Sequence, residues 1–220
     1  INFKAGLIYR PFNWFRIGGA IHTPTYYGFM RDTWNSDITS VFNDSTQWNS
    51  TEFSPLGEFR YQMATPFRAI GSLAFVIGQY GLISAEYEYV NYNQARFYES
   101  DNTFDGVNNE IEAKYTSPLN IRFGTEWRIQ NFRIRGGFGY YGSPYCSGQN
   151  GEQNSTVKNL GERYVISGGL GYRGQYFFCD VAYTWSKMTE DYYFYDPSLV
   201  NPSHNILYSH LISTTFGVRF

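Results

Sequence analysis

The sequence is dominated by long stretches in which every second residue is apolar. Over 117–129, one side of an extended chain would carry Leu119, Ile121, Phe123, Thr125, Trp127 and Ile129. The other side would carry Asn120, Arg122, Gly124, Glu126 and Arg128. A period of two is that of a β-strand, whose successive side chains point to opposite faces. The pattern predicts an all-β, antiparallel fold, with strands at 2–11, 14–24, 56–77, 81–95, 117–129, 132–141, 162–173, 176–187 and 207–220.

The connections between these strands alternate strictly in length. Short turns at 11–13, 78–81, 130–131 and 174–175 alternate with long polar segments at 25–55, 96–116, 142–161 and 188–206. A soluble sandwich uses strands of about five or six residues and has no such alternation. Transmembrane barrels have long strands, short turns on one side of the membrane and long loops on the other. The pattern therefore favours a transmembrane β-barrel over a sandwich.

The composition of the two strand faces points the same way. The charged face carries glycine with Arg or Glu, and the apolar face carries Tyr and Trp towards the strand ends. A polar lumen and a lipid-facing band with aromatic girdles would produce this distribution. The longest apolar runs, such as 73–78, are far shorter than the roughly 20 residues that a membrane helix needs. The strand-interior charges are expected on one face: Lys4, Arg16, Arg60, Arg68, Glu86, Glu88, Arg122, Glu126, Arg128, Arg133, Arg135, Arg163 and Asp180.

The strand count carries a further expectation. We interpret 56–77 as one strand kinked at Pro66, because a split there would give ten strands and invert the 25–55 loop. Nine is an odd number, and an open sheet edge cannot face lipid. We therefore expect 1–220 to be the C-terminal portion of one outer-membrane barrel. Earlier strands of the same protein, or another chain, would complete it. The final aromatic residue, Phe220, resembles the signal that the barrel-assembly machinery reads.

Three segments resemble the FadL family of outer-membrane transporters for fatty acids and hydrocarbons, in the form found in Bacteroidetes-type bacteria. They are 65–97, 118–145 and 166–186, and the pattern includes GTEWR at 124–128 and RGGFGYYGSP at 135–144. The resemblance implies a fourteen-stranded barrel with an N-terminal plug. About nine strands would then be present here, with the plug and the first strands absent.

The 25–55 segment holds the candidate ligand-binding residues. It has more large apolar side chains than a loop in water needs, and exposed patches of this kind mark binding sites. By the resemblance, it would form half of an outer docking groove for a hydrophobic small molecule. The alternative is a loop whose aromatic residues pack on one another. The candidates are Tyr26, Tyr27, Phe29, Met30 and Trp34, with Phe42 and Trp48 nearby.

The hairpin around 130–131 gives the most specific structural expectation. A two-residue turn pairs Ile129 with Phe132, Glu126 with Arg135, and Arg128 with Arg133. The last pair repels and calls for a nearby carboxylate. We expect an Arg–carboxylate network lining the lumen, with Asp180 reaching it from across the lumen. Its members would be Glu86, Glu88, Arg122, Glu126, Arg128, Arg133, Arg135 and Asp180.

The leading functional hypothesis is passive uptake of a small hydrophobic compound, such as a long-chain fatty acid or hydrocarbon, across the outer membrane of a Gram-negative bacterium. The alternative is a non-transporting barrel that serves as a shuttle or scaffold in protein secretion or surface assembly. Catalysis is not expected, because an outer-membrane hydrolase needs a His near Ser or Asp at the outer rim of the barrel. The sequence has only His22, His204 and His210, and His210 is expected on the lipid side. A net charge of −2 argues against a nucleic-acid partner.

The two cysteines, Cys146 and Cys179, lack metal-ligand spacing, so no metal and no cofactor is expected. A disulfide between them is disfavoured, because Cys146 lies in a loop and Cys179 within a strand.

Overall fold

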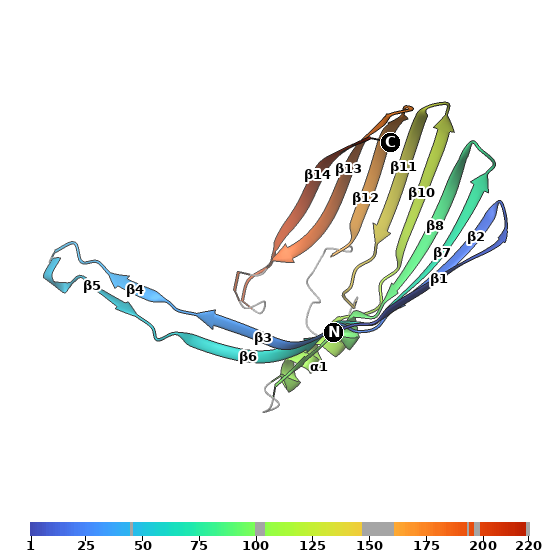
Figure 1. Ribbon diagram of the computed structural model, residues 1–220. Coiled ribbons are helices and arrows are strands. Elements are labelled where there is room, and N and C mark those ends of the chain that lie inside the picture. The colour runs from blue at the N-terminus through green and yellow to red at the C-terminus, as the bar shows by residue number, and fades with distance from the viewer. Residues whose placement is uncertain (45, 100–103, 147–160, 193, 196–198, 219–220) are drawn as a thin grey trace.

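The computed structural model describes residues 1–44, 46–99, 104–146, 161–192, 194–195 and 199–218. Its main feature is a curved antiparallel sheet of nine strands, in the order β1-β2-β7-β8-β10-β11-β12-β13-β14 (Figure 1). The strands are β1 (Lys4–Phe12), β2 (Phe15–His22), β7 (Arg68–Ile77), β8 (Gly81–Val90), β10 (Asn120–Ile129), β11 (Phe132–Tyr141), β12 (Arg163–Arg173), β13 (Phe177–Tyr192) and β14 (Ser203–Val218). The all-β, antiparallel fold is confirmed. The edge strands β1 and β14 do not pair with each other, so the sheet is open.

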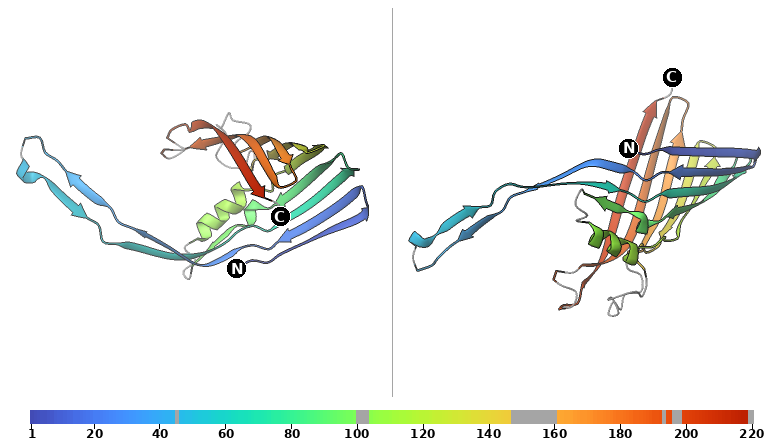
Figure 2. Two further views of the ribbon diagram at one scale, coloured as in Figure 1. Left: turned by 45° about the horizontal axis from the view of Figure 1, so that its top comes forward. Right: turned by 90° about the horizontal axis from the view of Figure 1, so that it is seen from below.

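A second feature is a long two-stranded ribbon that projects beyond the sheet (Figures 1 and 2). We call residues 25–65 the arm. It contains β3 (Tyr26–Trp34), β4 (Asp37–Ser40), the 3-10 turn η1 (Thr46–Trp48), β5 (Ser50–Phe53) and β6 (Gly57–Ala64). Near its base lie η2 (Tyr92–Gln94), the short strand β9 (Arg96–Tyr98) and the helix α1 (Asp105–Lys114). Strand β9 pairs with the base of β6.

The arm corrects two expectations. The segment 25–55 is largely a β-ribbon rather than a loop, and 56–77 is two strands in different sheets rather than one kinked strand. The physical reason is a pair of prolines. His22 faces Arg68 on one side of them and Tyr26 faces Ala64 on the other, so Pro24 and Pro66 stand at the same level of the hairpin. Because proline cannot donate to a ladder, both strands lose their pairing there at once.

Other boundaries differ by smaller amounts. Residues 91–95 leave the sheet, so the strand expected at 81–95 ends at Val90. The β13–β14 hairpin is longer than expected, because its pairing continues beyond the expected ends at 187 and 207 to Tyr192 and Ser203. The expected alternation of short turns and long connections is confirmed, because β1–β2, β7–β8, β10–β11 and β12–β13 all join by short turns at the same end of the sheet. Phe220 lies outside the described residues.

The pairing expected at 130–131 is confirmed in every pair from Ile129–Phe132 to Asn120–Tyr141. Gln130 has a φ of 52°, the left-handed conformation that such a tight turn requires. Through the register of the neighbouring strands, Arg122 and Phe123 lie on opposite faces, and the charges expected in these strands share one face. Arg60 is the exception, because it lies in β6, outside this sheet.

The two faces of the sheet differ in exposure as well as chemistry. On the polar face, the side chains of Glu88 and Glu126 are 6% and 20% exposed. On the apolar face, Leu170 and Phe216 are 63% and 75% exposed. Side chains crowd on the concave side of a curved sheet and spread on the convex side. The exposures therefore indicate that the polar face is concave and the apolar face is convex.

Aromatic side chains gather at both ends of the apolar face. At the turn end, Phe12 stacks on Trp14 at 5.4 Å between ring centroids, and Phe132 packs edge-on to Tyr172 at 5.5 Å. At the other end, Tyr140 packs on Tyr164 at 5.1 Å. Lys187 also lies on this face, paired with Tyr164 at the loop end. The ten residues of β10, at about 3.4 Å each and tilted by about 40°, span about 25 Å, the height of a lipid-facing band.

Cys146 and Cys179 are both free, so the disulfide that the sequence disfavoured is absent. No helix among the described residues combines the length and the apolar character needed to cross a membrane.

Candidate ligand groove and charged wall

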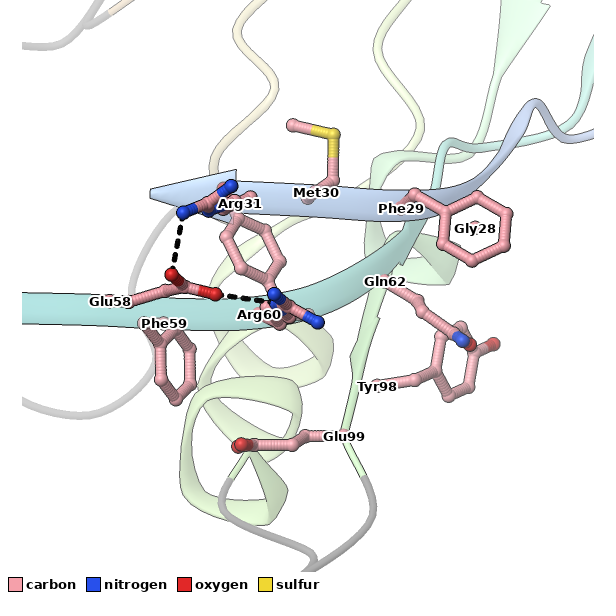
Figure 3. Close-up of a pocket in the computed structure, with 11 residues that line it drawn as sticks. Gly28, Phe29, Met30, Arg31, Glu58, Phe59, Arg60, Gln62, Tyr98 and Glu99 are labelled. Atoms are coloured by element: carbon pink, nitrogen blue, oxygen red, sulfur yellow. Dashed lines mark hydrogen bonds and ion pairs between the residues drawn. The ribbon is translucent and has the colours of Figure 1, made fainter. Parts of the chain in front are cut away.

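A hollow lies at the base of the arm, where β3, β6 and β9 meet. It has a volume of about 850 Å³. Figure 3 shows the side chains around it, with Phe29 and Met30 from β3, Glu58 and Arg60 from β6, and Tyr98 from β9. We call this hollow the arm groove. It is lined by Gly28, Phe29, Met30, Arg31, Glu58, Phe59, Arg60, Tyr61, Gln62, Tyr98 and Glu99.

A β-bulge in β3 shapes the arm groove. Tyr27 pairs with Met63 and Met30 pairs with Tyr61, so Gly28 and Phe29 together oppose one residue of β6. A bulge of this kind bends a strand and re-aims its side chains. Phe29 is fully exposed as a result, which is unusual for a phenylalanine within a strand. The bulge thus gives the groove an apolar side chain that makes little contact with the rest of the chain.

The polar wall of the arm groove is built around Glu58. Its carboxylate pairs with Arg60 Nε and with Arg31 Nη2, each at 2.6 Å (Figure 3). The hydrogen bond from Arg60, together with the charges of Arg31 and Arg60, holds the pKa of Glu58 below its usual value, against a smaller opposing effect of desolvation. Two guanidinium groups share this carboxylate, and Glu99 adds a second carboxylate to the lining, so the charges around the groove balance.

An aromatic cluster holds the arm to the rest of the chain. Phe104, which precedes α1, packs on Phe59, Tyr61 and Phe97 with ring centroids 5.3–5.9 Å apart. Burial, and then the nearby Asp32 carboxylate, raises the pKa of Tyr61. Because a two-stranded hairpin is at best marginally stable alone, these contacts and β9 are what fix the base of the arm.

The sequence-predicted ligand residues are only partly brought together. Phe29 and Met30 line the arm groove. Tyr26 lies beside it, with its hydroxyl bonded to Gln62 and its ring 6.4 Å from that of Tyr98. Tyr27 does not line the groove, and Trp34 packs over Gly57, where a Cβ would collide with the indole ring. Phe42 and Trp48 lie exposed farther along the arm.

The sequence did not indicate the other residues that line the groove as site residues: Gly28, Arg31, Glu58, Phe59, Arg60, Tyr61, Gln62, Tyr98 and Glu99. They belong to β3, to β6, and to β9 with the residue that follows it. The alternation of apolar and polar residues over 57–62 was visible in the sequence. That β6 leaves the main sheet to face β3 was not.

The charges on the polar face of the sheet form two groups. The first lies towards the loop end. Glu88 pairs with Arg68 at 2.9 Å and with Arg122 at 2.7 Å, and Arg122 also pairs with Glu86. The second lies at the turn end, where Glu126 pairs with Arg128 at 3.1 Å and with Arg135 at 2.8 Å. Arg135 in turn pairs with Asp180 at 2.7 Å, and Asp180 with Arg173 at 2.9 Å.

A glycine explains how Asp180 reaches Arg135 across an intervening strand. Asp180 is on β13 and Arg135 on β11, with Gly169 and Gly171 of β12 between them. A Cβ at Gly171 would collide with the Asp180 carboxylate. The missing side chain therefore leaves the path along which the carboxylate crosses β12. The expectation that Asp180 acts from across the lumen was wrong, because it lies on the same wall two strands away.

Two further details differ from the expected network. Glu86 and Glu88 pair with Arg122 and do not reach the turn end, because the register sets Arg122 opposite Glu86. Arg133 donates to the backbone oxygens of Gln130 and Phe132, at 3.0 and 2.9 Å, instead of to a carboxylate. Arg68 and Arg173 were missed as members, although both were visible on the charged side of their strands.

The three histidines lie on two strands of the sheet, β2 and β14. His204 bonds Asp191 at 2.8 Å and His210 bonds the hydroxyl of Tyr183 at 2.7 Å, while His22 lies on another strand. Within the described part of the chain, no three His, Cys, Asp or Glu side chains are grouped so that they could hold a metal ion.

Comparisons with known proteins rest on the fold. No family model and no curated protein matches this sequence. Among solved structures, the crystal structure of a FadL homologue from Pseudomonas aeruginosa matches with a TM-score of 0.54 and 12% sequence identity. The match covers 98% of this chain and 50% of that chain, so this chain spans about half the length of the relative. At this sequence identity the match supports a statement about the fold alone, which is that the chain has a FadL-like fold.

Proposed function

We propose that the protein is the C-terminal portion of an outer-membrane barrel that takes up small hydrophobic compounds, such as long-chain fatty acids or hydrocarbons. The observation that carries the proposal is the arm groove. A volume of about 850 Å³ suits a ligand of that size, and Phe29, Met30, Phe59 and Tyr98 give it apolar walls. The groove stands at the loop end of the sheet, where a compound from outside the cell would arrive.

The membrane placement is supported by the two faces of the sheet. A convex apolar face with aromatic residues at both ends suits lipid, and a concave charged face suits a wet lumen. Because the edges of β1 and β14 could not face lipid unpaired, further strands must close the barrel in the membrane. We propose that these strands belong to the same protein or to a second chain.

The test is uptake of a fluorescent long-chain fatty acid by cells that depend on the full-length protein. Replacing Phe29 and Met30 by Ala should lower uptake several-fold at low ligand concentration, because the groove loses apolar area. Phe53→Ala is the matched control, since Phe53 is an exposed aromatic residue of the same arm outside the groove. Equal uptake by all three proteins at equal surface abundance would refute the role of the groove.

A scaffold function is the second candidate, and the outer part of the arm favours it. Residues 35–56 contain Asp37, Asp44 and Glu52 with no Lys, Arg or His. Ile38, Phe53 and Leu56 stand more than two-thirds exposed there. Such a surface suits contact with another protein more than capture of a small molecule. Deleting residues 36–54 separates the two functions, because a scaffold would lose its role while uptake through the groove would persist.

A further inference from the structure

Lys187 is an exception to the division of charge between the two faces of the sheet. Within the described strands of the sheet, the register places every other lysine and arginine on the polar face, apart from Arg10, which lies at the β1 bulge and bonds Asn13. Lys187 lies on the apolar face, between Tyr164 of β12 and Tyr208 of β14. A charge on the lipid-facing surface of a barrel costs free energy, and this cost falls from the midplane towards the interfaces. The height of Lys187 on its strand therefore decides how well a membrane tolerates it.

Lys187 stands near the outer end of the lipid-facing band. Cys179 lies in the turn-end row of Phe132 and Tyr172. Lys187 follows Cys179 by eight residues on β13, which at about 3.4 Å each and a tilt of about 40° places it about 21 Å higher. The lipid-facing band of a barrel is about 25 Å tall, and the lipid headgroups lie just beyond the hydrocarbon. Because a lysine side chain is long and extends towards the interface, its ammonium group reaches the headgroups of the outer leaflet.

No carboxylate of the described residues forms an ion pair with Lys187. Glu162, one row higher on the neighbouring strand, accepts hydrogen bonds from two tyrosine hydroxyl groups, one of them that of Tyr164 at 3.1 Å. Farther along β13, the side chain of Asp191 is fully buried and bonds His204 at 2.8 Å. Both carboxylates are thus engaged with other groups. The ammonium group of Lys187 is therefore available to an anion from outside the chain.

The side chains around Lys187 suit a lipid. Tyr164 and Tyr208 flank it, and Trp185, two residues nearer the turn end, packs on Tyr208 with ring centroids 6.2 Å apart. Tyrosine and tryptophan gather at the headgroup level of membranes, because the ring contacts apolar groups and the polar tip reaches water. Ile166, paired with Trp185, is 52% exposed. The arrangement leaves an apolar surface for an acyl chain directly below the cation.

We propose that Lys187 is a binding site for the phosphate group of a lipid in the outer leaflet. The inference rests on the membrane placement proposed above but not on the identity of the transported compound. Lysine side chains near a membrane surface attract anionic headgroups. A phosphate at Lys187 neutralises its charge, and the lipid that carries it fixes the height of the β12–β14 side of the barrel in the membrane.

The test titrates the natural full-length protein, in a mild detergent, with two lipids and measures the dissociation constants by native mass spectrometry. Dioleoyl phosphatidic acid supplies a phosphate group, and dioleoylglycerol carries the same acyl chains without it. Lys187→Gln should weaken the binding of phosphatidic acid about fivefold, which corresponds to about 1 kcal/mol for one cation at the membrane surface. The binding of dioleoylglycerol should be the same in both proteins.

Two further variants make the assignment specific. Lys187→Arg keeps the positive charge and should bind phosphatidic acid about as tightly as the natural protein. Lys114→Gln is the matched control, because Lys114 lies on α1 and pairs with Glu110 away from the sheet. It should also leave the binding of phosphatidic acid unchanged. Far-UV circular dichroism verifies that each variant keeps its β structure.

Three outcomes would overturn the inference. They are equal binding of phosphatidic acid by the natural protein and Lys187→Gln, an equal loss of phosphatidic acid and dioleoylglycerol binding in the variant, and displacement of phosphatidic acid by inorganic phosphate. The last would assign the site to free phosphate instead of a lipid. Because Lys187 lies outside the arm groove, Lys187→Gln should take up the fatty acid normally. Any of the three outcomes, together with uptake that depends on Phe29 and Met30, would reject the lipid site and leave the proposed function standing.

Discussion

The sheet and the arm begin as the same hairpin and end as different kinds of structure. On the sheet side of Pro24 and Pro66, β2 and β7 each pair with a second neighbour and present one apolar and one charged face. On the other side, β3 and β6 pair with each other, and β6 gains only the three residues of β9. A strand with two neighbours and two defined environments tolerates few changes, whereas a ribbon in water tolerates many. Pairing on both sides, with one apolar and one charged face, is therefore confined to the sheet and ends at the two prolines.

The largest expected effect tests the faces of the sheet. Ile166→Arg places a charge on the apolar face and should destabilise the barrel by about 2–4 kcal/mol at the membrane midplane. Ser167→Arg changes the next residue, on the polar face, and should stay within about 0.5 kcal/mol of the natural protein. Ile38→Arg on the arm should change the free energy of unfolding by an equally small amount. Urea titration of protein refolded into lipid vesicles measures all three, and equal losses of stability at 166 and 167 would contradict the assignment of the two faces.

The same comparison explains what could be read from the sequence. The period of two in β10 and β11 determined the pairing around 130–131, and every pair was confirmed. The arm could not be read in this way, because the alternation over 56–77 runs through Pro66 without change while the pairing partner changes. The crossing of Asp180 over Gly171 was equally hidden, since it depends on which strand lies between β11 and β13. The groove depends on a one-residue bulge that no periodicity reveals.

A smaller effect is expected from the ion pairs. Asp180→Asn removes the carboxylate that Arg135 and Arg173 share, and it should cost about 1–2 kcal/mol after allowance for solvent screening. Glu58→Gln removes the corresponding carboxylate of the arm and should have the weaker effect, because that group is more exposed. Gly171→Ala should resemble Asp180→Asn, since a methyl group would push the carboxylate away. The reverse order of the two carboxylate variants in urea titration would contradict this ranking.

The smallest expected effect is a dependence of the arm on pH. The pKa of Glu58 is lowered in the folded arm by the hydrogen bond from Arg60 and by the charge of Arg31. Its stabilisation is therefore present above the ordinary carboxyl pKa of about 4.3 and is lost as the pH falls from there through the lowered value. Amide exchange in β3 and β6, corrected for the intrinsic pH dependence, should speed up in that window. Glu58→Gln should remove this step, and an unchanged step in the variant would assign it to another group.

The central claim is that the apolar face of the sheet contacts lipid and the polar face contacts water. Spin labels test it most directly. Single cysteines at positions 165–170 of β12 would each carry a label, in full-length protein in which Cys146 and Cys179 are replaced by Ala. Collision rates with oxygen, which dissolves in lipid, should peak at 166, 168 and 170. Collision rates with a water-soluble nickel complex should peak at 165, 167 and 169, because successive residues of a strand face opposite sides. The reverse alternation, or no alternation at all, would contradict the account.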